Sequence, residues 1–160
     1  MSLVSHQGIF SSARWLCLVL LALILSFGLS WLVLLPFDFG YQWLYQLIGI
    51  DQHIAEFGPA NVLKQGFEFT TEAERFGLFS AIVTSIHNHG FGLDILLYHN
   101  AQGVTLNKLL THDEVVHLRD VAILIDNMRM LLIVSGALFV ALLLWIDFSA
   151  RSLPTFRSML

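Results

Sequence analysis

The chain has 160 residues, of which 56% are hydrophobic and only 12% are charged, and its mean hydropathy is +0.73. A soluble domain is about 25% charged, so this composition argues against a water-soluble protein. The net charge of −4 and the scattered Lys and Arg residues argue against nucleic-acid binding, which needs clustered basic residues. The single cysteine, Cys17, excludes an intramolecular disulfide, and we expect it to be a packing residue.

Two uncharged apolar runs, residues 15–37 and residues 130–146, lie near the two ends of the chain. A helix needs about 20 apolar residues to cross a bilayer, and both runs are near that length. A cleaved signal peptide has an apolar core of about 7–15 residues and a small-residue cleavage site, which the first run does not match. The two runs therefore predict two retained transmembrane helices in a mainly α membrane protein.

Small residues recur at close spacing within both runs. Because small residues let helices approach closely in lipid, they predict helix packing, within a pair or a larger bundle. The predicted contact residues are Ala22, Ser26 and Ser30 in the first helix and Gly136, Ala137 and Ala141 in the second.

The charges of the tails predict the orientation in the membrane. The N-terminal tail carries Arg14, and the C-terminal tail carries Arg151 and Arg157. Positively charged tails stay in the cytoplasm, so we expect both termini inside and the central domain outside the cytoplasmic membrane. The predicted segments are a cytoplasmic tail (1–14), a transmembrane helix (15–37), an extracytoplasmic, mostly helical domain (38–128), a second transmembrane helix (129–147) and a cytoplasmic tail or loop (148–160).

The central domain shows signals for several elements. Residues 37–50 are rich in aromatic residues, which collect at membrane interfaces, so they predict an interfacial helix or turn. Residues 61–69 alternate loosely and predict an extended segment, and residues 100–103 predict a turn. Thr71 and Glu74 have the spacing of a capping box, and the apolar period after them predicts a helix over 72–86.

A second capping box, Thr111 with Glu114, begins a helix whose apolar stripe includes Val115, Ala122 and Ile125. No helix-breaking residue follows before the second apolar run. We therefore expect one long helix that rises from the central domain directly into the bilayer.

The best candidate for chemistry is at the start of this helix. Asp113, His117 and Asp120 project from one face, because residues three and four apart are neighbours, and Glu114 lies at its edge. A carboxylate beside an imidazole can fix its tautomer, as general acid–base catalysis requires. His117 lies about three turns above the second run, which is headgroup height. From spacing alone, a capped, exposed and charged helix start explains the same residues more simply.

His87 and His89, with His99 nearby in sequence, are the second candidate. A pair of histidines is a weak metal signal because zinc takes three or four protein ligands. No third ligand has a diagnostic spacing, so we expect a polar loop between helices and predict neither a metal nor a cofactor.

Residues 111–121, Thr-His-Asp-Glu-Val-Val-His-Leu-Arg-Asp-Val, resemble a known pattern. That pattern has an acidic residue, two further residues, His-Leu or His-Met, and Asp-Val two positions later, just before a second membrane helix. Leu97-Tyr98 also resembles a Tyr-Leu segment that precedes the pattern. The chain is similar in these residues, and in its layout over about 15–147, to integral membrane proteins related to the bacterial lipoprotein intramolecular transacylase.

The resemblance implies an activity without a cofactor or metal. The family moves an acyl chain from the sn-2 ester of a diacylated lipoprotein to the α-amine of its N-terminal cysteine, which gives the lyso-form. His117 matches the motif histidine, with an implied role as general base or acid, and Glu114 and Asp120 match the motif carboxylates, which would orient the ring and the helix. The implied partners are the inner-membrane bilayer and a diacylated lipoprotein.

The family has four membrane helices, and its second functional histidine lies near the third and fourth. No residue of this chain matches that histidine. The resemblance therefore implies either an N-terminal fragment of a four-helix fold or a shortened relative, and in both cases a chain that is incomplete for catalysis. The competing hypothesis is a non-enzymatic two-helix membrane protein whose outer domain binds a partner.

Overall fold

The computed structural model describes residues 3–151, with side chains for residues 12–149, and it is mostly helical, at 78%. Residues 1–2 and 152–160 lie outside this description, and so does Arg157 of the predicted C-terminal tail. The chain divides into two compact units. One consists of the two terminal helical segments, with boundaries at Trp31 and Arg129, and the other consists of residues 32–128.

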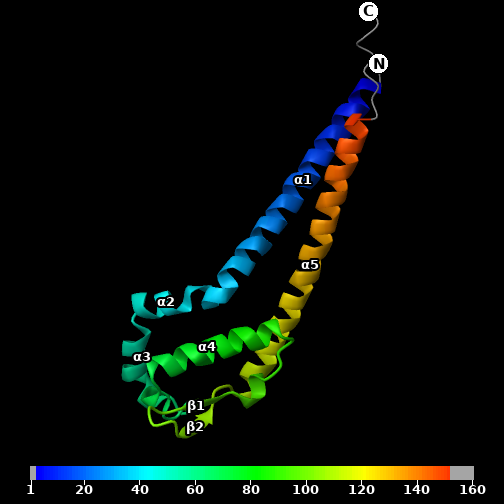
Figure 1. Ribbon diagram of the computed structural model, residues 1–160. Coiled ribbons are helices and arrows are strands. Elements are labelled where there is room, and N and C mark those ends of the chain that lie inside the picture. The colour runs from blue at the N-terminus through cyan, green and yellow to red at the C-terminus, as the bar shows by residue number, and fades with distance from the viewer. Residues whose placement is uncertain (1–2, 152–160) are drawn as a thin grey trace, which may run out of the picture. The chain divides into compact units, whose positions relative to one another are not determined.

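The terminal unit contains the apolar parts of two long helices, α1 (Leu3–Leu34) and α5 (His112–Arg151) (Figure 1). Each contains a segment that is long and apolar enough to cross a membrane, by length and composition. The prediction of two such helices is confirmed, and so is the continuity of the second helix with the capping box before it. Within the predicted tails, the chain is helical from Leu3 and up to Arg151.

The two helices of this unit pack through glycine and serine. A Cβ atom built on Gly28 would lie 2.2 Å from a methyl carbon of Leu132, so a larger residue at this position would force the Leu132 side chain to move. Ser135 is buried, and a Cβ atom on Gly136 would meet Leu25 at an ordinary 3.7 Å. Close approach at small residues is the usual way in which membrane helices associate.

The predicted set of contact residues between the two helices was therefore only partly correct. Gly136 lies at the contact, but Ser26, Ser30, Ala137 and Ala141 are exposed. The two serine hydroxyls donate to carbonyl oxygens four residues earlier in α1, at 2.7 and 2.9 Å. Serine in an apolar helix commonly satisfies its hydroxyl in this way, and so it needs no partner helix.

In the central unit, the chain turns sharply after α1 through the 3₁₀ segment η1 (Leu35–Gly40), which contains Pro36. Asp38, Phe39 and Gly40 follow one another in the left-handed conformation, with φ of 49°, 55° and 74°. Two short helices come next, α2 (Tyr41–Leu47) and α3 (Ile50–Phe57). The aromatic-rich segment is therefore a turn followed by a helix, and Trp43 of α2 is exposed.

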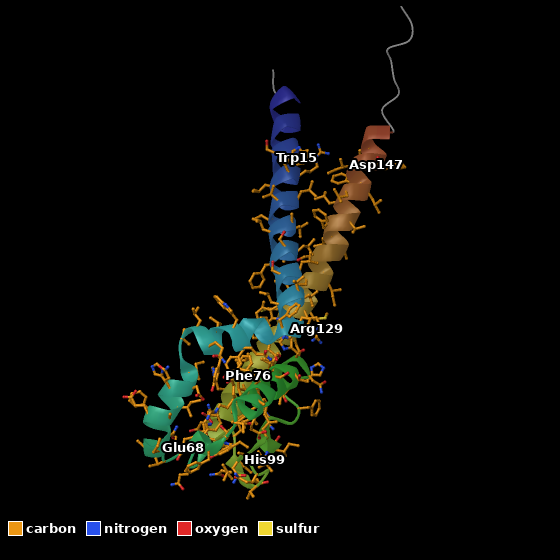
Figure 2. The ribbon with its side chains drawn as sticks, turned by 60° about the vertical axis from the view of Figure 1, so that its left-hand side comes forward. Trp15, Glu68, Phe76, His99, Arg129 and Asp147 are labelled. Carbon is orange, nitrogen blue, oxygen red and sulfur yellow. The ribbon has the colours of Figure 1, made fainter. Side chains whose placement is uncertain are left out.

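Helix α4 (Glu72–His87) confirms the predicted helix after the first capping box, because Glu74 N donates to Thr71 Oγ1 at 3.1 Å. It runs alongside α2 in the opposite direction (Figure 1). The Tyr41 ring of α2 stacks on Phe79 of α4 with centroids 3.9 Å apart. Phe76 lies between the two helices, edge-on to the Tyr41 and Tyr45 rings (Figure 2).

Short elements complete the central unit: η2 (Gly58–Ala60), η3 (Phe67–Phe69), η4 (Leu93–Ile95) and the strands β1 (Leu97–His99) and β2 (Thr105–Lys108). The strands pair antiparallel, with Tyr98 opposite Asn107, and the predicted turn at 100–103 joins them. The predicted extended segment at 61–69 was wrong. Its residues form turns, because the Asn61 side chain accepts from Leu63 N and Lys64 N and Gly66 adopts a φ of 81°.

The core of this unit forms where α4 meets the hairpin and the start of α5. Leu78, Tyr98 and Leu109 are buried at its centre. The hydroxyl of the fully buried Tyr98 donates to Gln65 O at 2.8 Å, as a buried phenol requires. Partly buried apolar residues pack around them: Phe67, Ile82, Leu96, Leu106 and Leu110.

Candidate functional site

The motif segment occupies the first turns of α5, and its two faces have different environments. Val115, Ala122 and Ile125 are buried against the central unit, as the apolar stripe predicted. His117 and Asp120 are exposed. The helix period therefore places these two polar side chains on the face that is open to a ligand.

Glu114 is held at the other edge of the helix by a closed capping box. Its Oε2 atom accepts hydrogen bonds from Thr111 N at 2.7 Å and from Thr111 Oγ1 at 3.0 Å. The same oxygen accepts from Lys64 Nζ at 2.8 Å, and Lys64 also donates to Leu109 O. Glu114 thus ties the 61–69 turns to the start of α5.

His117 and Asp120 form no hydrogen bond or ion pair with any other residue in the described part of the chain. In the structure, His117 is therefore hydrogen-bonded to neither motif carboxylate. The hydrogen bonds of Glu114 are to Thr111 and Lys64 instead. The imidazole of His117 is left accessible, with both ring nitrogens available to a ligand. An accessible imidazole can act as a general acid or a general base toward a bound ligand.

The other histidines named by the sequence have separate partners. His87 Nδ1 lies 2.7 Å from Val83 O in its own helix, and His89 Nδ1 lies 2.6 Å from Asp126 Oδ2. His99 Nδ1 lies 2.9 Å from Glu74 Oε1. These side chains do not converge, and among the described residues no group of three His, Cys, Asp or Glu side chains could hold a metal ion.

Arg75 of α4 is a buried polar centre that the sequence analysis missed. Its side chain is 6% exposed, and it donates to Thr70 Oγ1 at 2.7 Å, to Thr70 O at 2.9 Å and to the Tyr45 hydroxyl at 2.6 Å. It also pairs with Asp51 of α3. One guanidinium thereby joins α2, α3 and α4.

The charge of Arg75 is stabilised by these partners. Burial alone would lower its pKa, but the hydrogen bonds to Tyr45 and Asp51 outweigh burial and raise the pKa above its ordinary value. The sequence feature that could have indicated this buried centre is the basic residue Arg75, which lies next to the apolar stripe of the predicted helix. Its partners lie up to thirty residues away, so the sequence pattern could not name them.

Comparisons of the chain with protein-family models, with curated proteins and with solved structures found no match.

Proposed function

We propose that this protein is a membrane acyltransferase of the lipoprotein transacylase type in a bacterial inner membrane, with His117 as its acid–base residue. Three observations support the proposal. The chain carries two helices long and apolar enough to cross a membrane. The segment 111–121 resembles the family motif. His117 is exposed, without a partner among the described residues, so it is available to a substrate.

The surface of α5 supports a position of His117 near lipid esters. Ile123 and Leu124 are apolar and are 60% and 57% exposed, although they precede the uncharged run. They lie only six and seven residues after His117, which corresponds to about 9–11 Å along a helix. The headgroup layer of a bilayer has a similar thickness, about 5–8 Å on each side. We infer that the lipid-facing surface of α5 begins close to His117.

The proposed step needs no further reactant. The α-amine nitrogen of the lipoprotein's N-terminal cysteine attacks the carbonyl carbon of the sn-2 ester and forms an amide bond. The ester bond to the glycerol oxygen breaks, and that oxygen leaves as an alcohol. His117 takes the proton from the amine nitrogen and gives it to the departing oxygen, which is ordinary general base and acid catalysis.

The two motif carboxylates have different roles in this proposal. Glu114 positions the helix, through Thr111 and Lys64. Asp120 lies one turn after His117 and orients its ring when substrate is bound. Both are positioning residues, and only His117 contacts the reacting atoms.

The test is expression of the complete gene that encodes this chain, together with a diacylated lipoprotein, in a host that lacks the activity. Mass spectrometry of the N-terminal peptide should show the lyso-form with an N-acylated cysteine. His117→Ala should abolish it, whereas His112→Ala, a change at an exposed histidine of the same helix, should not. Absence of the lyso-form with the unchanged gene would refute the enzymatic proposal.

One observation favours the non-enzymatic alternative, a membrane-anchored domain that binds a partner. One oxygen of the Glu114 carboxylate, Oε2, accepts from Thr111 and Lys64 in a structural role, and no carboxylate is hydrogen-bonded to His117 among the described residues. Under this alternative, the lyso-form would be absent in the same experiment and His117→Ala would behave like His112→Ala.

A further inference from the structure

A pocket of about 430 Å³ lies within the central unit between the turn that follows α1 and the last turns of α4. Small-molecule sites in proteins have volumes of roughly 300–1,000 Å³, so this pocket is large enough for a ligand. Leu35, Pro36 and Val83 form its apolar wall, and the polar groups are contributed by Asp38, Ser80, Thr84, His87 and Asn88.

Four of the five polar side chains of this pocket have no hydrogen-bond partner in the described part of the protein, and those of Thr84 and Asn88 are exposed to solvent. Asp38, Ser80, Thr84 and Asn88 form no side-chain hydrogen bond or ion pair with any other residue in the described part of the chain. Ser80 and Thr84 lie four residues apart on α4, so their hydroxyls are neighbours on one face. A few convergent polar groups in an otherwise apolar recess are typical of a binding site.

The turn that supplies Asp38 is strained. Asp38 and Phe39 are not glycine, yet both have a positive φ, of 49° and 55°. Non-glycine residues in this conformation persist only where the surrounding structure holds them. The Phe39 ring lies against the His87 ring of α4, with centroids 6.2 Å apart. This contact holds the turn on α4, so that Asp38 forms part of the pocket wall.

The position of the pocket indicates the kind of ligand. It begins at the first residues after α1, where Val33 and Leu34 are 61% and 48% exposed and continue the apolar surface of the helix. A ligand here has an apolar neighbour on one side and, on the other, a carboxylate together with two hydroxyl groups, an amide and the imidazole of His87. A carboxylate repels an anionic headgroup and attracts an ammonium group.

We propose that this pocket binds the primary ammonium headgroup of a membrane amphiphile, with phosphatidylethanolamine as the representative ligand. Asp38 accepts charge-assisted hydrogen bonds from the ammonium group. The Ser80 and Thr84 hydroxyls and the Asn88 amide donate to the phosphate oxygens. A choline headgroup carries the same charge but has no N–H donor, so it binds less tightly. The site is separate from His117 and does not depend on the acyl-transfer proposal.

The experiment measures lipid binding to the full chain in a neutral detergent. Short-chain phosphatidylethanolamine, phosphatidylcholine and phosphatidylglycerol are titrated separately, and bound lipid is counted by native mass spectrometry. The ethanolamine lipid should bind at least about fivefold more tightly than the other two. Asp38→Asn should reduce its affinity by about tenfold or more, because a charged hydrogen bond is lost. Asn tolerates positive φ as well as Asp does, so the turn is preserved.

A matched control and a second variant complete the test. Glu56→Gln removes an exposed carboxylate of α3 and should leave lipid binding unchanged. The double variant Ser80→Ala/Thr84→Val keeps Asp38 and should weaken binding of the ethanolamine lipid about threefold to tenfold, so it serves if Asp38→Asn does not fold. Competition by free ethanolamine for the bound ethanolamine lipid would support recognition of the ammonium group. Equal binding of the three lipids, or an unchanged affinity in both variants, would overturn the proposal.

Discussion

The carboxylate of Glu114 and the ammonium group of Lys64 lie 2.8 Å apart, although fifty residues separate them in the chain. The first carboxylate of the motif is therefore committed to holding the start of α5, together with Thr111. Its place in the proposed motif and its role in stability are compatible, because the proposal requires the helix that carries His117 to be fixed. This relationship leads to the first prediction.

Lys64→Met and Glu114→Gln should each lower the free energy of unfolding of the central unit by about 1 kcal/mol, through loss of the cap and the partly exposed ion pair. The two changes share one contact, so the double variant should lose less than the sum. Thermal unfolding in detergent measures both quantities. Glu56→Gln, at an exposed carboxylate of α3, should change stability by less than about 0.5 kcal/mol. Strict additivity of the two changes would contradict this role of the pair.

Arg75→Lys should destabilise the central unit by about 2 kcal/mol. A lysine ammonium cannot reproduce the planar fork that contacts Thr70, Tyr45 and Asp51, and it leaves a buried acceptor without a donor. Arg119→Lys is the matched control, since Arg119 is exposed and lies 3.7 Å from Asp94. Unfolding curves of the two variants are compared in the same detergent, and equal midpoints would show that Arg75 has no special role.

Gly28→Ala should disturb the packing of α1 against α5, because the added Cβ atom would overlap the Leu132 side chain. We expect a lower unfolding temperature, and recovery when Leu132→Ala is added to make room. Gly77→Ala, in α4, is the matched control because nothing lies within 4 Å of its added Cβ atom. That change should be neutral or stabilising by up to about 1 kcal/mol. A similar response of the two glycines would argue against the contact.

The raised pKa of Tyr98 leads us to expect a loss of stability at alkaline pH. Its pKa is raised, first by burial and then by the negative charge of Glu68, so the folded state keeps the phenol neutral. In the unfolded chain a tyrosine ionises near pH 10. The stability contribution is therefore complete below about pH 10 and is lost as the pH rises from there toward the pKa of the folded state. Above about pH 10, the free energy of unfolding should fall less steeply with pH in Tyr98→Phe than in the unchanged protein. Identical pH profiles of the two proteins would contradict this role of Tyr98.

The sequence was informative where a signal is local. The uncharged runs predicted two long helices, and Thr71 and Thr111 marked the starts of α4 and α5 to within a residue. The turn at 100–103 followed from its composition. Each of these features depends on residues within one turn or one helix face, so no knowledge of the fold was needed.

The long-range partners could not be predicted in this way. The backbone N–H of Glu74 donates to the Thr71 hydroxyl, as a capping box requires. The carboxylate of Glu74, however, is hydrogen-bonded to His99 in β1 and not to the backbone N–H of Thr71. The partners of Arg75 come from other helices, and the contact at Gly28 depends on which face of α1 meets α5. Whether His117 has a carboxylate partner is a question of the same kind, because several carboxylates are within reach by spacing alone.

The most direct test of the acyl-transfer proposal uses the purified product of the complete gene, reconstituted in vesicles with a synthetic diacylated lipopeptide. The mass of the lipopeptide stays constant on transfer, so fragmentation is used to locate the acyl chain. We predict that the chain moves from glycerol to the cysteine amine, that His117→Ala stops this movement, and that His112→Ala does not. Transfer that continues at the same rate in His117→Ala would contradict the assignment of His117, and no transfer by the unchanged protein would contradict the proposed function itself.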